Sequence, residues 1–266
     1  MLKMVEKGEL FLEDTVASLL PELPLHNSYD SSPSLAMMLE HTAGLADLSA
    51  REFNYLKPLS LQKAFAVNPK AKKVLWEPGC HYSYSNAGAG YVAAAIEKKT
   101  GVDYDLWFAR EILKPLGMTQ SQLYWSEEIQ SRLVQGYDTD LRKPIPYWHT
   151  LFRAFGGLNS TPNEMARFLS LLVNKGELDG KRVFSSASID RMESPLTSLS
   201  AKNGIVLAYG LGLRSEAIRG HKVFSHGGDA DGYLAHFAYS HESGRGYFVV
   251  INAFNHRILD QFQGFL

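Results

Sequence analysis

Tyr84-Ser85-Asn86 is the first of two short segments whose side chains could do chemistry. It follows Pro78-Gly79 and precedes a helical pattern. A phenol held at a turn can act as a general base where nearby cations lower its pKa, and an amide two residues later can face the same cleft. A Tyr-x-Asn sequence alone is also typical of a plain turn, in which the Asn bonds its own backbone.

The second segment is Phe224-Ser225-His226-Gly227-Gly228-Asp229, on or at the end of a strand pattern. Paired glycines let a ligand approach the backbone, so the amides there could bind an oxyanion while the histidine supplies a donor. A glycine turn beside a strand histidine would have the same sequence. Each segment alone therefore leaves a functional and a purely structural interpretation open.

Helices are predicted on both sides of the Tyr84 segment. Ser34 caps an apolar run that we expect to end at Gly44 as a left-handed C-cap. Gly101 closes the helix that starts near Gly88. Gly176 is expected as the C-cap of a helix over 162–174. Further helical patterns cover residues 2–8, 12–20 and 104–112.

The character of the sequence changes after about residue 202, where short aromatic and β-branched runs are separated by turns that contain glycine. These runs predict antiparallel strands over residues 205–213, 222–226, 233–240 and 247–253. The histidine segment then lies on or just after the second of these strands.

The order of these pieces resembles the class C β-lactamase, D-alanyl-D-alanine peptidase and esterase family of penicillin-recognising serine hydrolases. The opening residues 2–10 resemble the end of that family's nucleophile helix. The later matching elements are Leu39-Glu40-His41-Thr42-Ala43-Gly44-Leu45, Pro78-Gly79 with Tyr84-Ser85-Asn86, Gly156-Gly157-Leu158 with Ser160-Thr161, Tyr209-Gly210-Leu211-Gly212 as a strand, and His226-Gly227-Gly228.

The resemblance implies roles for individual residues. Tyr84 would shuttle the nucleophile's proton, and Asn86 would orient the substrate. His226 would occupy the position of a lysine in β-lactamases, which favours esterase or peptidase relatives because a histidine is near half charge at neutral pH. Gly227, Gly228 and Asp229 would bind the oxyanion or substrate, with the Asp229 amide as half of the oxyanion hole.

The family's Ser-x-x-Lys nucleophile is expected within about ten residues before Met1, which is less than three helical turns. An acyl-transfer mechanism needs that hydroxyl and a neighbouring base. The sequence contains one other match, Ser60-Leu61-Gln62-Lys63, which we interpret as a helix N-cap. We therefore expect a truncated or degenerate relative, inactive alone, or a non-catalytic binding relative that keeps the cleft.

The resemblance implies an α+β, β-lactamase/transpeptidase-like fold, with an antiparallel sheet flanked by helices and a mainly helical lobe. We expect residues 1–266 to form one such domain without its N-terminal strands. The helical lobe would cover about 20–200 and the sheet lobe about 201–266. Only the three C-terminal strands of a five-stranded sheet would be present, which leaves the strand at 247–253 with an open edge.

Composition limits the partners. The 27 Lys and Arg against 28 Asp and Glu give no strong field, so nucleic acid is an unlikely class of partner. No membrane span or signal-peptide core is found, and the chain as written is predicted to be unexported. By resemblance, the full-length protein is expected in the periplasm or attached to a membrane. The expected ligand is a small ester, an amide or an acyl-peptide.

Three other possibilities carry less weight. Cys80 precedes His81, but neighbours in sequence point apart, so a buried or half-buried structural thiol is expected. The histidine spacings do not suit a metal pair, and no metal or cofactor is expected. Gly88-Ala89-Gly90-Tyr91-Val92-Ala93 matches a loose dinucleotide fingerprint, but no aliphatic strand precedes it, so nicotinamide binding is the weakest alternative.

Overall fold

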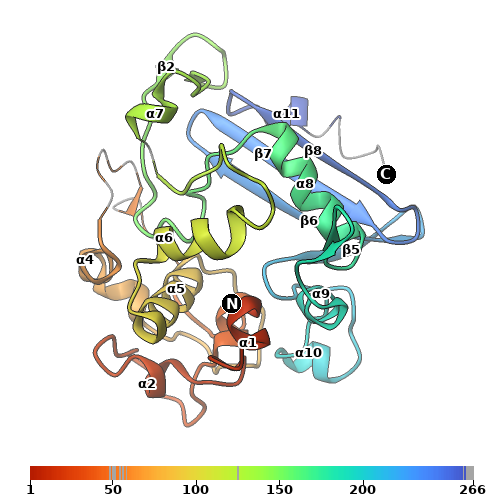
Figure 1. The fold of residues 1–266 in the computed structure, drawn as a ribbon. Coiled ribbons are helices and arrows are strands. Elements are labelled where there is room, and N and C mark those ends of the chain that lie inside the picture. Colours follow the sequence, from red (N-terminus) through yellow and green to blue (C-terminus); the bar gives the residue numbers. More distant parts are fainter. Residues whose placement is uncertain are drawn as a thin grey trace.

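A computed structural model describes residues 1–47, 49, 52, 53, 55, 57, 59–124, 126–259 and 261. Helices gather on one side of an antiparallel sheet, and α8 lies across that sheet (Figure 1). The helical elements are α1 (Leu2–Glu6), α2 (Val16–Leu19), α3 (Leu35–Leu39), α4 (Leu61–Val67), η2 (Pro69–Lys72), α5 (Ala87–Thr100), α6 (Tyr104–Phe108), η3 (Ala109–Leu113), α7 (Glu127–Gln130), α8 (Pro162–Val173), α9 (Ser186–Glu193), α10 (Leu199–Lys202) and α11 (His256–Leu259).

The main sheet has the strand order β5-β6-β7-β8, and each neighbouring pair is antiparallel. This confirms the predicted antiparallel sheet, although four strands are present in the described residues where three were expected. The strands are β5 (Arg214–Ile218), β6 (His221–Ala230), β7 (Tyr233–Ser240) and β8 (Arg245–Ile251). Two minor hairpins are β1 (Gly136–Tyr137) with β2 (Pro144–Ile145), and β3 (Glu177–Leu178) with β4 (Lys181–Arg182).

The predicted strand over 205–213 is wrong. The segment folds into turns that lead into β5, because Gly212 adopts φ 79° and the Gly210 N–H donates to Leu213 O at 2.7 Å. The Ser215 N–H also donates back to Ala208 O at 2.8 Å. Tyr209 therefore sits in a tight turn beside the sheet, joined to Arg214 by an isolated bridge.

The helix that Ser34 caps ends earlier than predicted. The Ser34 hydroxyl accepts from Met37 N at 3.3 Å, as expected, but α3 stops at Leu39. His41 takes the left-handed conformation, with φ 54°. Gly44 is also left-handed, yet it is not the C-cap: a Cβ there would lie 2.0 Å from Trp76 O, so glycine is required by a close loop contact.

The helix α8 begins at its predicted proline, with the Thr161 side chain accepting from Glu164 N. Its C-cap is Asn174, and the predicted cap Gly176 lies two residues later. Lys175 takes the first left-handed position, with φ 51°, and Gly176 N then donates to Leu171 O at 2.8 Å. Ion pairs from Lys175 to acidic residues of α9 hold this residue in a conformation that usually favours glycine.

The helix α5 confirms the predicted helix and its left-handed cap, Gly101. Its small residues allow close packing on α3, since a Cβ on Gly88 would lie 2.4 Å from Met38 O. Gly88 and Gly90 are therefore inside a packed helix, not in the strand-to-helix turn that binds a dinucleotide. The close contacts of these glycines within α5 give them a packing role.

Separate apolar cores support the helices and the sheet. One core surrounds α5, where Tyr91 and Ala93 are fully buried. Another lies between α8 and the sheet, where Leu172 of α8 packs with Phe224 of β6 and Tyr239 of β7. No helix in the described part of the chain is long and apolar enough to cross a membrane.

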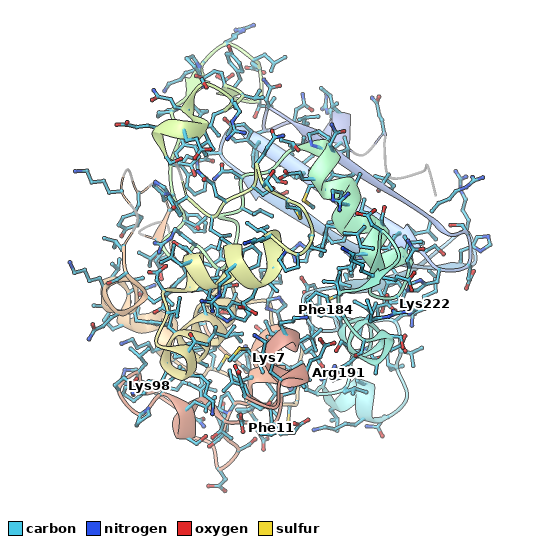
Figure 2. All side chains as sticks on the ribbon, viewed as in Figure 1. Lys7, Phe11, Lys98, Phe184, Arg191 and Lys222 are labelled. Carbon is cyan, nitrogen blue, oxygen red and sulfur yellow. The ribbon has the colours of Figure 1, made fainter. Side chains whose placement is uncertain are left out.

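A buried carboxylate joins the end of α3 to α9. Glu40 is 1% exposed, and its Oε1 accepts from the Arg191 guanidinium at 2.7 Å. Its Oε2 accepts from the N–H groups of Leu196 and Thr197 at 2.9 and 2.8 Å. Figure 2 shows Arg191 below the sheet, near the helices of the N-terminal part. This junction fixes the α3 end, and with it His41, against the segment that leads to the sheet.

Candidate active site

The Tyr84 segment is a loop that runs into α5. Tyr84 is 39% exposed, and its hydroxyl lies 3.5 Å from Asn86 Oδ1. Asn86 is the N-cap residue of α5, but its side chain makes no capping bond. Asp47 Oδ1 accepts instead from Asn86 N at 2.9 Å and from Asn86 Nδ2 at 3.3 Å. A carboxylate from a distant part of the chain therefore holds the amide of Asn86 in place.

The histidine segment lies within β6, as the sequence predicts. The pairing of β5 with β6 ends at Arg214 opposite Ser225, whereas β7 pairs with β6 as far as Ala230. Beyond Ser225, one edge of β6 therefore has no paired strand in the described residues. Gly227, Gly228 and Asp229 are exposed along this stretch, so those of their backbone groups that point away from β7 are accessible to a ligand.

The packing of the protein does not require either glycine of this segment. Neither adopts a positive φ. A Cβ on Gly227 would meet the His236 ring at 3.7 Å, and a Cβ on Gly228 would meet the Ala235 Cβ at 3.9 Å, both ordinary contact distances. Glycines that the fold does not need are consistent with room left for a ligand.

Aromatic rings connect the two segments. Tyr209 lies between them, with its ring 6.1 Å from that of Tyr84 and 5.9 Å from that of His226. His41 stacks on Tyr84 at 4.0 Å, and Tyr82 stacks on Tyr209 at 5.6 Å. Tyr209 is 8% exposed, and its buried hydroxyl has no hydrogen-bond partner in the described part of the chain. The structure thus links Tyr84 and His226 through one aromatic cluster, and Asn86 lies beside the Tyr84 hydroxyl.

Burial opposes the charged forms of the two main side chains. It raises the pKa of Tyr84, and the carboxylates of Asp47 and Asp229 and the phenol of Tyr82 raise it further. Tyr84 is therefore a protonated phenol at neutral pH. The groups that shift its pKa do not include the cation that a general base would need.

Burial also lowers the pKa of His226 from its ordinary value, although a hydrogen bond to Gly227 O acts the other way. The expectation of a half-charged histidine is therefore wrong, and the ring is mainly neutral at pH 7. Its Nδ1 lies 2.6 Å from Gly227 O, so Nδ1 carries the proton of the neutral ring and Nε2 is an acceptor. A neutral His226 suits a neutral ligand group better than a carboxylate.

The other candidate nucleophiles lie elsewhere or are unreactive. Ser60 occupies the N-cap position of α4, as predicted, without a capping bond from its side chain. That helix lies across the helical region from β6 (Figure 1). Cys80 is half-buried, as predicted, and its thiol donates to Glu77 Oε2 at 3.5 Å. Burial and this carboxylate raise the pKa of the Cys80 thiol, which disfavours the thiolate.

Comparisons with known proteins identify the class. The Beta-lactamase family model matches residues 1–260, so the chain belongs to the Beta-lactamase family of serine hydrolases. It has the α+β, β-lactamase/transpeptidase-like fold of that family.

Individual relatives agree with this assignment. The octameric penicillin-binding protein homologue from Pyrococcus abyssi is 26% identical, with a TM-score of 0.79, and the match covers 94% of this chain and 58% of that chain. Penicillin-binding protein 4* of Bacillus subtilis (strain 168) is 27% identical over 253 residues, which cover 86% of this chain and 52% of that protein. A D-stereospecific amidohydrolase from Streptomyces sp. shares the fold, with a TM-score of 0.74, 21% identity, and coverage of 100% of this chain and 83% of that chain.

The chain is shorter than its curated relatives. The match covers 37% of Beta-lactamase-like protein 2 of Dictyostelium discoideum and 55% of protein Rv1367c of Mycobacterium tuberculosis. The activity, substrate and partners of the whole protein are therefore matters for proposal.

Proposed function

We propose that the residues gathered around Tyr84 and His226 form the ligand site of a serine-dependent acyl hydrolase that acts on an ester or an amide, including an acyl-peptide. The observation that carries this proposal is the aromatic cluster that joins the Tyr84 loop to the accessible edge of β6. One structural relative, the D-stereospecific amidohydrolase from Streptomyces sp., supports the amide class. Tyr84, Asn86 and His226 would be the supporting side chains, and Gly227, Gly228 and Asp229 the backbone that binds the carbonyl oxygen.

In the proposed reaction a serine Oγ attacks the carbonyl carbon and the carbonyl π electrons move to oxygen. The serine proton passes through Tyr84 to the leaving alcohol or amine as the acyl–leaving-group bond breaks. Water then hydrolyses the acyl-enzyme. The family's Ser-x-x-Lys serine is not beside Tyr84 in the described residues, so we expect this chain by itself to bind acyl ligands without turning them over.

A second candidate function is a binding relative that uses the same site without catalysis. The raised pKa of Tyr84 favours it, because a protonated phenol donates a hydrogen bond and does not remove a proton. This candidate shares the ligand class with the first and differs from it in having no acyl-enzyme in any form of the protein.

The test uses the chain as it exists with two probes, a small chromogenic ester and benzylpenicillin. We expect thermal stabilisation by at least one probe, no hydrolysis and no increase in intact mass. A stoichiometric acyl adduct would contradict the expected inactivity, and peptide mapping would identify the hydroxyl that reacts. The absence of both stabilisation and adduct would overturn the proposed ligand class.

The same assay separates the candidate side chains from the rest of the chain. Tyr84→Phe and His226→Ala should each reduce the stabilisation. The matched controls are Tyr29→Phe, at a half-exposed tyrosine whose hydroxyl donates to Leu75 O, and His221→Ala, at an exposed histidine at the start of the same strand. Equal losses in the controls and the site variants would contradict the placement of the ligand in this site. A longer form of the protein that carries a Ser-x-x-Lys would distinguish hydrolase from binding relative.

A further inference from the structure

His41 has a backbone conformation that is uncommon for a residue with a Cβ. It follows the end of α3 with φ 54°, in the left-handed region that a side chain with a Cβ rarely adopts. Its ring is buried, with 8% of the residue exposed. Such a conformation persists where the surrounding contacts over-determine it, and it clusters at functional sites. The neighbouring Glu40 junction supplies that constraint from one side.

The ring of His41 contacts the Tyr84 loop and the turn that carries Tyr209. It stacks on the Tyr84 ring at 4.0 Å with an interplanar angle of 29°. It meets the Tyr209 ring edge-on, at 4.7 Å and 77°. Its Nδ1 lies 3.2 Å from the backbone N of Ser85, the residue directly after Tyr84. One imidazole therefore contacts both the ring of Tyr84 and the backbone that carries it.

The Ser85 contact requires a neutral imidazole. The Ser85 N–H donates to Nδ1, so the proton of the neutral ring is on Nε2. A protonated ring would have no lone pair at Nδ1 and would donate to Ser85 O instead, which is also 3.2 Å away. Burial and the nearby His226 lower the pKa of His41 to about 4, although its hydrogen bond to the Ser85 backbone acts the other way, so the ring is neutral at pH 7 and Nδ1 can accept from Ser85 N–H.

We propose that His41 is the positioning residue of this site and sets the orientation of the Tyr84 phenol by stacking on its ring and accepting from Ser85 N–H. This inference rests on the proposed function, because the orientation of the Tyr84 phenol affects binding only if a ligand contacts Tyr84. The titratable groups around the His41 ring are Tyr84 and Tyr82 of the loop, Tyr209 of the turn before β5, and His226 of β6.

The experiment measures Tyr84 directly, without a ligand. In the intact chain with ring-labelled tyrosine, the Tyr84 NMR signal is assigned by its loss in Tyr84→Phe. His41→Asn keeps a residue that tolerates the left-handed conformation but removes the ring, and His41→Phe keeps a ring but removes the acceptor. We expect His41→Asn to remove the ring-current shift of Tyr84 and to bring its pKa down towards the ordinary value, whereas His41→Phe retains most of the shift.

His149→Asn is the matched control, since His149 is also buried and its ring meets another tyrosine, Tyr147, at 5.1 Å. It should leave the Tyr84 signal unchanged. An unmoved Tyr84 signal in folded His41→Asn would overturn the positioning role. If His41→Asn does not fold, the wild-type chain still provides the test: a cross-relaxation peak between the two rings is expected, and its absence refutes the stacking.

Ligand binding separates this inference from the proposed function. The dissociation constant for the stabilising probe should rise about tenfold in His41→Asn and by less in His41→Phe. Suppose that His41→Asn shifts the Tyr84 signal but neither His41→Asn nor Tyr84→Phe changes the affinity for the probe. That result would refute the proposed function but leave His41 as the group that positions Tyr84. Unchanged Tyr84 resonances with weakened affinity would refute the positioning role alone.

Discussion

The charge states of two side chains decide what the site can do. Tyr84 is held as a phenol and His226 as a mainly neutral imidazole, both because burial disfavours the charged form. The residues that the structure describes therefore offer hydrogen bonds to a ligand more readily than they move a proton. A working hydrolase needs a cation near Tyr84 in addition.

The phenol of Tyr84 should titrate above the ordinary tyrosine range, because desolvation and nearby carboxylates oppose the phenolate. The measurement is the ultraviolet absorbance of phenolate between pH 8 and 12, taken as the difference between the wild-type chain and Tyr84→Phe. A transition at or below the ordinary tyrosine pKa of about 10 would contradict the electrostatic account.

His41 should make the protein less stable as the pH falls from 6.5 to about 4. Its pKa is 6.5 in the unfolded reference and about 4 in the folded protein, so the unfolded state binds more protons within this window. The cost approaches about 3 kcal/mol below pH 4, at 1.36 kcal/mol for each pKa unit.

Urea denaturation at pH 4.5, 5.5 and 7 tests this, with His41→Asn as the comparison. The difference in unfolding free energy between the two proteins should shrink as the pH falls, because the other histidines contribute equally to both. A difference that is constant with pH would show that His41 titrates normally in the folded state.

The sequence predicts Tyr84, Asn86 and His226 as site residues, but not the residues that contact them. The roles of Asp47, Tyr82 and Tyr209 depend on contacts between segments that are far apart in the sequence. Local sequence patterns do not encode such contacts. His41 lies in one of the matched family elements, yet no local rule indicates that its ring reaches a loop more than forty positions away. The turn that carries Tyr209 was predicted as a strand, which concealed its place in the cluster.

Among the elements, β6 has two faces, and substitutions on them can distinguish an effect on ligand binding from an effect on folding. Successive residues of a strand point to opposite faces, so Gly228 shares a face with His226 and Gly227 faces the other way. The contacts that an added Cβ would make agree with this: on Gly228 it would meet Ala235, and on Gly227 it would meet His236.

Gly228→Ala should weaken probe binding more than Gly227→Ala, while neither changes the thermal midpoint greatly. Both substitutions meet only ordinary contact distances, so loss of folding is not expected. Isothermal titration with the stabilising probe, next to a thermal melt of each variant, makes the comparison. Equal effects on binding would argue against a ligand on the His226 face of β6.

The junction between α3 and α9 should be sensitive to the loss of one charge. Glu40→Gln replaces an acceptor oxygen with a donor amide in a buried network that accepts from Arg191, Leu196 and Thr197. We expect a loss of about 2–4 kcal/mol in unfolding free energy, from the unsatisfied buried donors. Glu22→Gln, at an exposed ion pair with Lys98, is the control and should show no measurable change.

Most of the elements follow from sequence pattern, and the failures have local causes. The strand over 233–240 and the helix capped by Gly101 were predicted because periodicity and cap residues coincide there. The apolar run at 205–213 has strand composition, but its two glycines and the bonds to Ser215 close turns instead. Gly44 was taken for a cap because a contact with the distant Trp76 cannot be foreseen.

As a whole molecule, the chain belongs to the Beta-lactamase family and has its α+β fold. The division into a helical lobe at about 20–200 and a sheet lobe at about 201–266 remains a proposal. The helix α8 shows how packing can cross such a sequence boundary, since it lies on the sheet while preceding it by many residues (Figure 1). Order along the chain predicted the fold class, but not which helices cover the sheet.

The Tyr84 loop and the β6 edge are proposed to form one binding site for an acyl ligand. The most direct measurement is backbone amide NMR of the intact chain during titration with an N-acylated D-alanyl-D-alanine peptide, in parallel with the probes above. The amide signals of residues 84–86 and 226–229 should shift together, with one common dissociation constant. Shifts confined to one segment, or none in either at saturating peptide, would contradict this proposal.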